Sequence, residues 1–280
     1  MELHDDDRPI GRVLSRREIL ALLGGAGAVA LVGAAGVKLV GAQTTVTPMP
    51  TLTGTATAVP SCVVRPALNE GPYFVDEMLN RSDIRVEPSD DSIKAGVVLK
   101  LNYTVSDVTG GVCSPLEGVQ VDVWHCDALG VYSGVQDRRF DTRALTFLRG
   151  YQLTDANGAA AFTTIVPDWY SGRAVHIHFK IRTDPAAAAG YEFTSQLFFD
   201  PDQVTAIYAD EAYAGKGATP DTPNDADGIF QGSDGLLTLE LVEDEDGSYS
   251  ANFSIGLDLS AEPVEAGGMG GGRPSRPPGA

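Results

Sequence analysis

Two histidines separated by a single residue are the side chains of this sequence best suited to hold a metal ion. His176 and His178 lie in residues 174–181, where Val, Ile and Phe alternate with His and Lys. A period of two residues is typical of a half-buried strand, on which alternate side chains share a face. The pattern therefore predicts two imidazoles side by side, although such pairs also occur as ordinary histidines of an amphipathic strand.

Two tyrosines near glycines add oxygen donors to this pair. Tyr170 lies just before His176 in a loop that contains Pro167 and Gly172, and Tyr132 ends a Gly-Val-Tyr triplet. A phenol with an ordinary pKa of about 10 loses its proton readily only beside a strongly charged cation. Zinc sites favour Cys, His and carboxylate, whereas two Tyr and two His suit a hard ion such as Fe(III). The residues predict non-haem Fe(III); a zinc hydrolase would lack a clear third ligand.

Five motifs make the sequence similar to a known family, the intradiol ring-cleavage dioxygenases, which include protocatechuate 3,4-dioxygenase and catechol 1,2-dioxygenase. The resemblance covers roughly residues 62–230. The motifs occur in the family's order: Gly-Pro-Tyr-Phe at 71–74, the signature from 116 to Tyr132, Ile-Val-Pro with Tyr170, Arg-x-x-His-x-His at 173–178, and Thr-Ser-Gln-Leu-Phe-Phe at 194–199. The chain is identified as an exported, single-chain branch of this family.

The resemblance implies an activity and a set of site residues. It implies Fe(III)-dependent intradiol cleavage of a catechol-type diol with O₂ to a cis,cis-muconic acid derivative. Arg173 would stabilise charge that develops on the ring, and Gln196 would be an amide near the metal. A non-catalytic exported β-sandwich that only binds a partner stays open as an alternative. The implied iron ligands are Tyr132, Tyr170, His176 and His178, of which Tyr170 would leave the metal and take a proton.

The substrate pocket is implied by the same resemblance. Gly71, Pro72 and Tyr73 resemble a segment that walls the pocket in protocatechuate dioxygenases, where a separate subunit supplies it. Here one chain carries both parts, so the segment could reach its own site or that of a neighbour. Trp169 could stack on the substrate or simply pack, and Arg173 completes the expected pocket. Because no basic residue is an evident partner for a carboxylate, catechol-like or lignin-derived diols are expected rather than protocatechuate.

The pattern of apolar residues predicts an all-β protein, a β-sandwich with one short helix and long loops. Asn157-Gly158 predicts a tight hairpin turn between two strands. Asp202 can cap a helix over 202–214. His125 is expected to be structural. The expected strands are residues 97–105, 119–126, 150–154, 159–165, 174–181, 194–199, 237–241 and 249–255.

The two ends of the sequence differ from its middle. Residues 1–42 contain Arg16-Arg17 before an apolar Gly/Ala-rich run, which is typical of a twin-arginine export signal; an uncleaved membrane anchor is the alternative. Residues 43–60 are a Thr/Pro linker, and residues 263–280, rich in Gly and Pro, are expected to be a disordered tail. The catalytic domain is therefore expected at 61–262, in a protein that is exported.

Charge and cysteines restrict the partners further. The formal net charge is −18, and the basic and acidic residues of 1–42 cancel, so the acidity belongs to the rest of the chain. Such a surface argues against nucleic acid and anionic membranes, with membrane contact only through an uncleaved signal. The expected partners are a small catechol and O₂, and homo-oligomers are compatible. By resemblance Cys126 is a buried small residue, so a Cys62–Cys113 disulfide is favoured over the other pairings or three free thiols.

Overall fold

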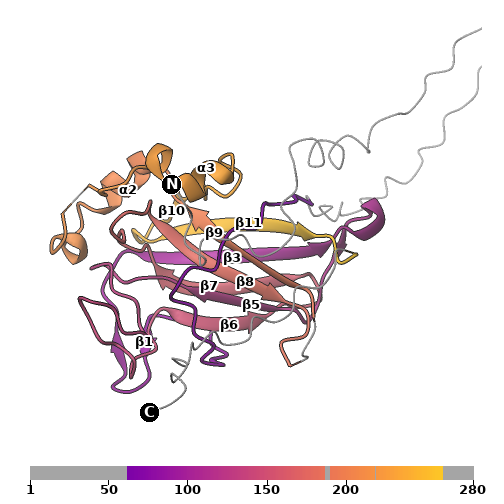
Figure 1. The fold of residues 1–280 in the computed structure, drawn as a ribbon, viewed down its shortest axis with the longest axis horizontal. Coiled ribbons are helices and arrows are strands. Elements are labelled where there is room, and N and C mark those ends of the chain that lie inside the picture. Colours follow the sequence, from indigo (N-terminus) through magenta and orange to yellow (C-terminus); the bar gives the residue numbers. More distant parts are fainter. Residues whose placement is uncertain (1–61, 187–189, 218, 261–280) are drawn as a thin grey trace, which may run out of the picture.

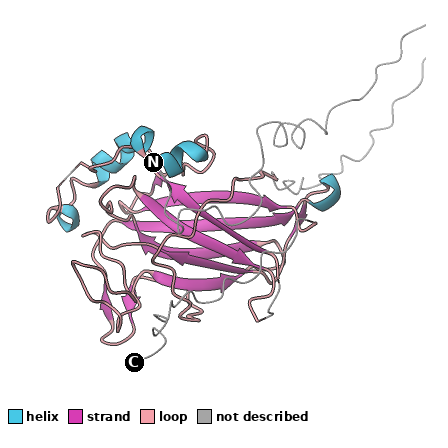
Figure 2. Ribbon diagram, in the orientation of Figure 1, coloured by secondary structure: helices cyan, strands magenta, loops and turns pink. Residues whose placement is uncertain are grey.

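A computed structural model describes residues 62–186, 190–217 and 219–260. The predicted signal, linker and tail lie outside these residues. The described chain forms two main β-sheets, with the helices outside the strands (Figures 1 and 2). The strands are β1 (Val86–Glu87), β2 (Ser92–Ile93), β3 (Val98–Asp107), β4 (Ser114–Pro115), β5 (Gln120–Trp124), β6 (Arg149–Leu153), β7 (Ala159–Ile165), β8 (His176–Arg182), β9 (Glu192–Phe198), β10 (Val242–Glu243) and β11 (Tyr249–Leu257).

The two sheets pack face to face around one apolar core. One sheet has the order β10-β11-β3-β4, with β7 also paired to β3, and the other has the order β6-β5-β8-β9. Strands β3 and β11 run parallel, although the other pairings of both sheets are antiparallel. Alternate residues of each strand face the core, as the period of two predicts. The expected β-sandwich architecture is confirmed.

The two sheets differ in how their outer faces are covered. Strand β7 alternates between exposed and buried residues, but every residue of β5 and β9 is buried. The cover over β5 and β8 includes residues 70–76: Phe74 packs on Trp124, and Asp76 forms an ion pair with Arg182. Because the outer face of β8 is covered, the polar side chains on it are buried.

Residues 62–84, called the N-terminal segment below, include residues 70–76 and also pair with the edges of the sheets. Val63 pairs with β11 through its carbonyl, and Leu68 donates to Thr194 of β9. Further along, Arg81 pairs with Tyr151 of β6, and Ile84 donates to Thr163 of β7. Figure 1 shows the indigo segment crossing the strands of the sandwich. Unpaired strand edges invite pairing with other chains, so this path satisfies their backbone groups within the molecule.

Two expected features of the sheets are wrong. Residues 237–241 form only one bridge, between Thr238 and Phe198, although their leucines are buried. The turn at Asn157-Gly158 exists, with Gly158 at φ +73°, but it joins β6 to β7, which belong to different sheets. The turn is therefore a crossover rather than a hairpin. Gly158 pairs with Val105 of β3, and a Cβ on Gly158 would lie 2.2 Å from the Val105 carbonyl oxygen.

The expected helix over 202–214 is shorter and starts earlier. Helix α2 spans Pro201–Ile207, and Asp200 rather than Asp202 is its N-cap, accepting from two backbone N–H groups. Pro201 fits the first helical position because its missing N–H needs no partner there. Asp210 then caps a new turn, which interrupts the helical spacing. The remaining helical elements are η2 (Thr109–Gly111), η3 (Glu211–Tyr213), η4 (Asn224–Ala226) and α3 (Gly228–Gly232).

The disulfide lies at one end of the sandwich. Cys62 and Cys113 are bonded, with their Cα atoms 5.9 Å apart, which is the pairing that the sequence favoured. Cys126 is a buried free cysteine whose thiol donates to the carbonyl oxygen of Asp168. Strand register puts the disulfide near the end of β3, whereas His176 begins β8 near the opposite end of the sandwich. Among the described residues, no helix has the length and apolar character needed to cross a bilayer.

Candidate metal centre

Strand β8 brings His176 and His178 together on its outer face. Their Nε2 atoms are 3.1 Å apart, and the two side chains are almost completely buried. His176 Nδ1 donates to the carbonyl oxygen of Ala174 at 2.6 Å, which leaves the lone pair on Nε2. The His178 ring stacks on Trp124 at 5.0 Å. The two Nε2 atoms are thus held close together, and the one on His176 is unprotonated.

Gly71 packs closely against the His178 ring. Gly71 has φ +72°, and a Cβ at this position would lie 3.1 Å from Cε1 of His178. The N-terminal segment therefore approaches the imidazole more closely than a larger residue would permit. His178 Nδ1 is buried without a hydrogen-bond partner in the described part of the chain.

Tyr132 points at the same place from the loop after β5. Its hydroxyl oxygen lies 3.4 Å from His176 Nε2, and its side chain is buried. Asp127 shapes the loop by accepting from the N–H groups of Leu129 and Val131. Gly130 has φ +73°, and a Cβ there would lie 2.6 Å from the Trp169 carbonyl oxygen. The glycine of the Gly-Val-Tyr triplet therefore allows the two tyrosine-bearing loops to meet.

Tyr170 reaches the centre through another tyrosine. Its hydroxyl lies 2.5 Å from the hydroxyl of Tyr73, which also hydrogen-bonds to Asp137 Oδ2 at 2.8 Å. A hydroxyl has one proton, so Tyr170 donates to Tyr73 when Tyr73 donates to Asp137. The Tyr73 ring stacks on Tyr132 with the centroids 4.5 Å apart. The segment containing Gly71, which the sequence left free to reach either site, thus contributes to the centre of its own chain.

A buried arginine that the sequence did not single out fixes two of these segments. Arg149 begins β6 and donates from Nη1 to the carbonyl oxygen of Tyr73 at 2.7 Å. Its Nε donates to the carbonyl oxygen of Ser133, the residue after Tyr132, at 3.0 Å. Burial lowers the pKa of Arg149 to about 10. Arg149 therefore joins the Tyr132 loop to the N-terminal segment.

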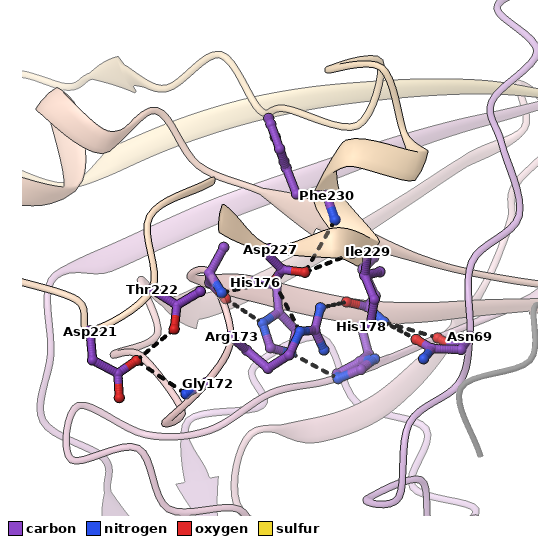
Figure 3. A network of polar contacts seen from close by, with 12 residues as sticks. Asn69, Gly172, Arg173, His176, His178, Asp221, Thr222, Asp227, Ile229 and Phe230 are labelled. Carbon is purple, nitrogen blue, oxygen red and sulfur yellow. Dashed lines mark hydrogen bonds and ion pairs between the residues drawn. The ribbon is translucent and has the colours of Figure 1, made fainter. Parts of the chain in front are cut away.

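Arg173 lies beside the histidines in a network of polar contacts (Figure 3). Its Nη2 donates to Gln196 Oε1 at 2.6 Å, and its Nε donates to Asp227 Oδ2 at 2.9 Å. Gln196 in turn donates to the side-chain oxygen of Asn69 at 2.6 Å. Asp227 was not expected from the sequence. Its place before a short helix signals an N-cap, but no local pattern links it to a residue more than fifty positions earlier.

The remaining expected pocket residues lie at different distances from this centre. Pro72 is exposed beside Tyr73. Trp169 packs against the main core, and Lys216 Nζ lies 4.0 Å above the centre of its ring. The substrate contacts expected of both residues stay predictions. His125 is buried and bonds to Thr164 and to the Cys126 carbonyl, which agrees with a structural role.

The electrostatics of the buried groups favour a metal ion. Burial, together with the charge of Arg173, lowers the pKa of His176 to about 3, and burial also lowers the pKa of His178. Both imidazoles are therefore neutral at pH 7, the form that binds metals. Burial raises the pKa of Tyr132, so its phenolate would form only beside a cation.

These donors fit iron better than zinc. Two nitrogens each about 2.1 Å from one ion would lie about 3 Å apart at a right angle, close to the separation of the two Nε2 atoms. Within the described residues, no group of three or more His, Cys, Asp or Glu could hold an ion. An ion at this place would need tyrosine oxygens, which is the donor set expected for Fe(III) and not the usual set for zinc.

Comparison with known proteins agrees with this geometry. A family model described as Dioxygenase matches residues 69–232. A chlorocatechol 1,2-dioxygenase of Pseudomonas putida is 27% identical over 194 residues, which are 62% of this chain and 62% of that protein. A second chlorocatechol 1,2-dioxygenase, of Pseudomonas sp. strain P51, is 29% identical over 49% of this chain and 55% of its own length. The chain thus spans less than two thirds of these curated relatives.

A solved structure covers a larger share of the fold. The intradiol ring-cleavage dioxygenase from Tetranychus urticae superposes with a TM-score of 0.60 and 28% identity, over 72% of this chain and 97% of that one. The family model matches more than half of the chain and includes the two tyrosines, the two histidines and Arg173. This chain belongs to the intradiol ring-cleavage dioxygenase family.

Proposed function

We propose that this protein is a non-haem Fe(III) dioxygenase that cleaves a catechol-type diol between its two hydroxyl-bearing carbons. Both atoms of O₂ would enter the product, a cis,cis-muconic acid derivative. The observation that carries the proposal is the convergence of His176 Nε2, His178 Nε2 and the Tyr132 hydroxyl, with Tyr170 close by through Tyr73. This set is suited to Fe(III) and has no simple explanation in a protein that only binds a partner.

The four implied ligands, Tyr132, Tyr170, His176 and His178, would hold the iron. Bound there, Fe(III) would supply Lewis acidity to the diol oxygens and make the ring reactive toward O₂. The chain itself keeps both imidazoles neutral by burial and fixes the His176 tautomer through the Ala174 carbonyl. Preorganised ligands of this kind need little rearrangement when the metal binds.

Tyr170 would accept a proton during diol binding. As a phenolate, Tyr170 could take up a proton that the diol releases, and the Tyr73 hydroxyl, 2.5 Å away, could donate a hydrogen bond to that phenolate oxygen. Asp137 accepts from Tyr73 on the half-exposed side of the centre, which keeps the pKa of Asp137 below its ordinary value. Tyr73 also stacks on Tyr132, so its position is determined by both tyrosine-bearing loops.

Arg173 would stabilise negative charge on the bound diol. Its guanidinium is held by Asp227 and Gln196, and its charge contributes to the low pKa of both histidines, after burial itself. A fixed cation in a site that excludes water stabilises developing charge without reorganising. The two curated relatives are named chlorocatechol 1,2-dioxygenases, which supports a catechol-like diol as the substrate class. Lignin-derived diols belong to the same proposal.

Export is a further part of the proposal. The Cys62–Cys113 disulfide supports it, because disulfides persist mainly in oxidising compartments outside the cytoplasm. The twin-arginine pattern at Arg16-Arg17 supports the same location.

Visible absorption of the iron-loaded protein tests the function directly. A tyrosinate-to-Fe(III) band is expected, and it should shift to longer wavelength when catechol is added without O₂. With O₂ present, catechol should be converted to cis,cis-muconate. Tyr132→Phe should lower kcat/KM by about 100-fold or more, because even outer partners of a metal are typically worth 10- to 100-fold.

A tyrosine outside the site provides the matched control. Tyr191→Phe also removes one phenol oxygen, but Tyr191 lies at the opposite end of β9 from the site and its hydroxyl forms no hydrogen bond within the described residues. This variant should keep the band and the activity of the wild type. A protein that stays colourless after loading with ferric iron, or a Tyr132→Phe variant as active as Tyr191→Phe, would refute the proposed function.

A further inference from the structure

We propose that Asp227 is the positioning residue of this centre: one buried carboxylate that orients both the Arg173 guanidinium and, through the backbone of Ala174, the His176 ring. The inference deepens the proposed function and rests on it for the effect on catalysis. Neither the local sequence pattern nor the motifs that identify the family point to this residue.

The contacts of Asp227 divide between its two oxygens. Oδ2 accepts from Arg173 Nε at 2.9 Å and from the Ala174 N–H at 2.8 Å. Oδ1 accepts from the N–H groups of Ile229 and Phe230 at 2.8 and 3.3 Å, as the N-cap of α3. Figure 3 shows the carboxylate between the Arg173 side chain and the start of α3. The short helix thus anchors one oxygen while the other acts on the site.

Asp227 is charged although it is only 3% exposed. Burial opposes its charge, but Arg173 and the N–H groups of Ala174 and Ile229 outweigh this and hold the pKa of Asp227 below its ordinary value. A buried carboxylate with four donors has little freedom to rotate. It is therefore a rigid reference point for whatever bonds to it.

The guanidinium of Arg173 is held on two sides. Asp227 takes Nε, and Gln196, itself fixed by Asn69, takes Nη2. Arginine donates from a planar fork, so fixing two of its nitrogens fixes the plane of the group. The direction in which Arg173 presents its charge to the diol therefore depends on Asp227.

The backbone of Ala174 carries the same constraint to the metal ligands. Its N–H donates to Asp227, and its carbonyl oxygen accepts from Nδ1 of His176 at 2.6 Å. This hydrogen bond sets the tautomer and the orientation of the His176 ring, so a shift of the Ala174 backbone would turn the Nε2 lone pair away from the other donors. The Asp227 carboxylate thus influences both the Arg173 guanidinium and the His176 ring.

Asp227→Asn is the sharpest test, because asparagine has nearly the same shape and caps helices about as well as aspartate. Asp221→Asn is the matched control: Asp221 bonds to Ser171 Oγ and the Gly172 N–H of the same loop, on its exposed side, and has no hydrogen bond to Arg173 or Ala174. For each protein, kcat and KM for catechol, iron retained against a competing chelator, and the thermal midpoint would be measured.

Asp227→Asn is expected to lower kcat/KM 10- to 100-fold, mainly through kcat, and to lower iron retention about tenfold. Asp221→Asn should stay within about threefold of wild type in both. If Asp227→Asn folds poorly, Asp227→Ser takes its place. Serine keeps a capping oxygen but cannot reach Arg173 as a carboxylate does, so the same losses of kcat/KM and iron retention are expected. Equal losses in the Asp227 and Asp221 variants, or an Asp227→Asn variant within threefold of wild type, would overturn the inference.

The outcomes separate this inference from the proposed function. A wild-type protein that binds iron but does not convert catechol would refute the function, while iron retention would still compare Asp227→Asn with Asp221→Asn. A wild-type enzyme that converts catechol, with an unaffected Asp227→Asn variant, would refute only the inference.

Discussion

The two faces of strand β8 are both buried, but they are stabilised by different interactions. Ile177, Phe179 and Ile181 face the main core and are completely buried. His176, His178 and Lys180 alternate with them and are 2–4% exposed on the other face. The first face buries carbon, and its stability grows with the apolar area removed from water. The second buries polar atoms, each of which needs a specific partner.

This difference explains the path of the N-terminal segment. Lys180 forms ion pairs with Glu70 and Glu192, and its Nζ lies 4.2 Å above the Phe74 ring. Glu70 and Phe74 both belong to the segment that also carries Tyr73. The apolar face needs only packing of the right volume, whereas the polar face needs a particular chain to cross it. The segment that stabilises the polar face is therefore the one that completes the candidate metal centre.

Removing the cation shared by the two ion pairs of the polar face should produce one of the largest changes in stability. Lys180→Met is expected to lower the free energy of unfolding by about 3–5 kcal/mol, because it leaves the buried Glu192 carboxylate without its cation. This is the range also expected for Phe179→Ala on the apolar face, where the loss comes from a cavity. Urea unfolding at pH 7 measures both variants.

A double variant separates the two causes. Lys180→Met combined with Glu192→Leu should recover most of the lost stability, since well-packed apolar residues can replace a buried ion pair. A double variant as unstable as Lys180→Met alone would contradict the assignment of the loss to an uncompensated charge.

His125 sharpens the comparison, because it is a polar residue that bonds across the core to Thr164 of the other sheet. Burial lowers its pKa to about 4. The unfolded chain takes up a proton here below about pH 6.5, but the folded protein does so only near pH 4. The contribution of neutral His125 to the free energy of unfolding, about 3 kcal/mol, is therefore complete above pH 6.5 and lost as pH falls toward 4.

Unfolding curves of wild type and His125→Gln at pH 7 and pH 4 test this prediction. Wild type should lose about 3 kcal/mol more than the variant over that range. If both proteins lose the same stability, His125 does not contribute to the pH dependence.

The smallest expected effect comes from a polar atom within the apolar core. Tyr103 is 1% exposed among Phe162, Phe179 and Phe253, and its hydroxyl has no partner in the described residues. Tyr103→Phe should stabilise the protein by about 1 kcal/mol, since an unpaired buried hydroxyl is unfavourable. The thermal midpoint should rise by about 2–4 °C.

Another buried tyrosine is the matched control for this change. The Tyr213 hydroxyl donates to the Val166 carbonyl and accepts from the Val97 N–H. Tyr213→Phe should therefore lower the thermal midpoint. A lower midpoint for Tyr103→Phe as well would show that its hydroxyl has a partner after all.

The local sequence predicted much of this protein, because strand periodicity and turn chemistry depend on neighbouring residues. It predicted the sandwich, seven strands close to their observed bounds, and His176 and His178 on one face. The residues also pointed to Tyr132 and Tyr170 as oxygen donors, and the family resemblance added the roles of these tyrosines and of Arg173. The prediction failed at residues 202–214, where Asp210 starts a new turn, and at 237–241, where buried leucines form one bridge only.

Only the tertiary structure decided which distant residues serve the centre. Tyr73 lies beside Tyr170 because the N-terminal segment crosses the polar face of β8, and Asp227 reaches Arg173 because α3 begins there. Arg149 likewise joins Tyr73 to the Tyr132 loop. A buried charge or hydroxyl requires a partner but does not specify where in the chain the partner lies. The sequence by itself determined the donor types, and the fold selected the residues that hold them in place.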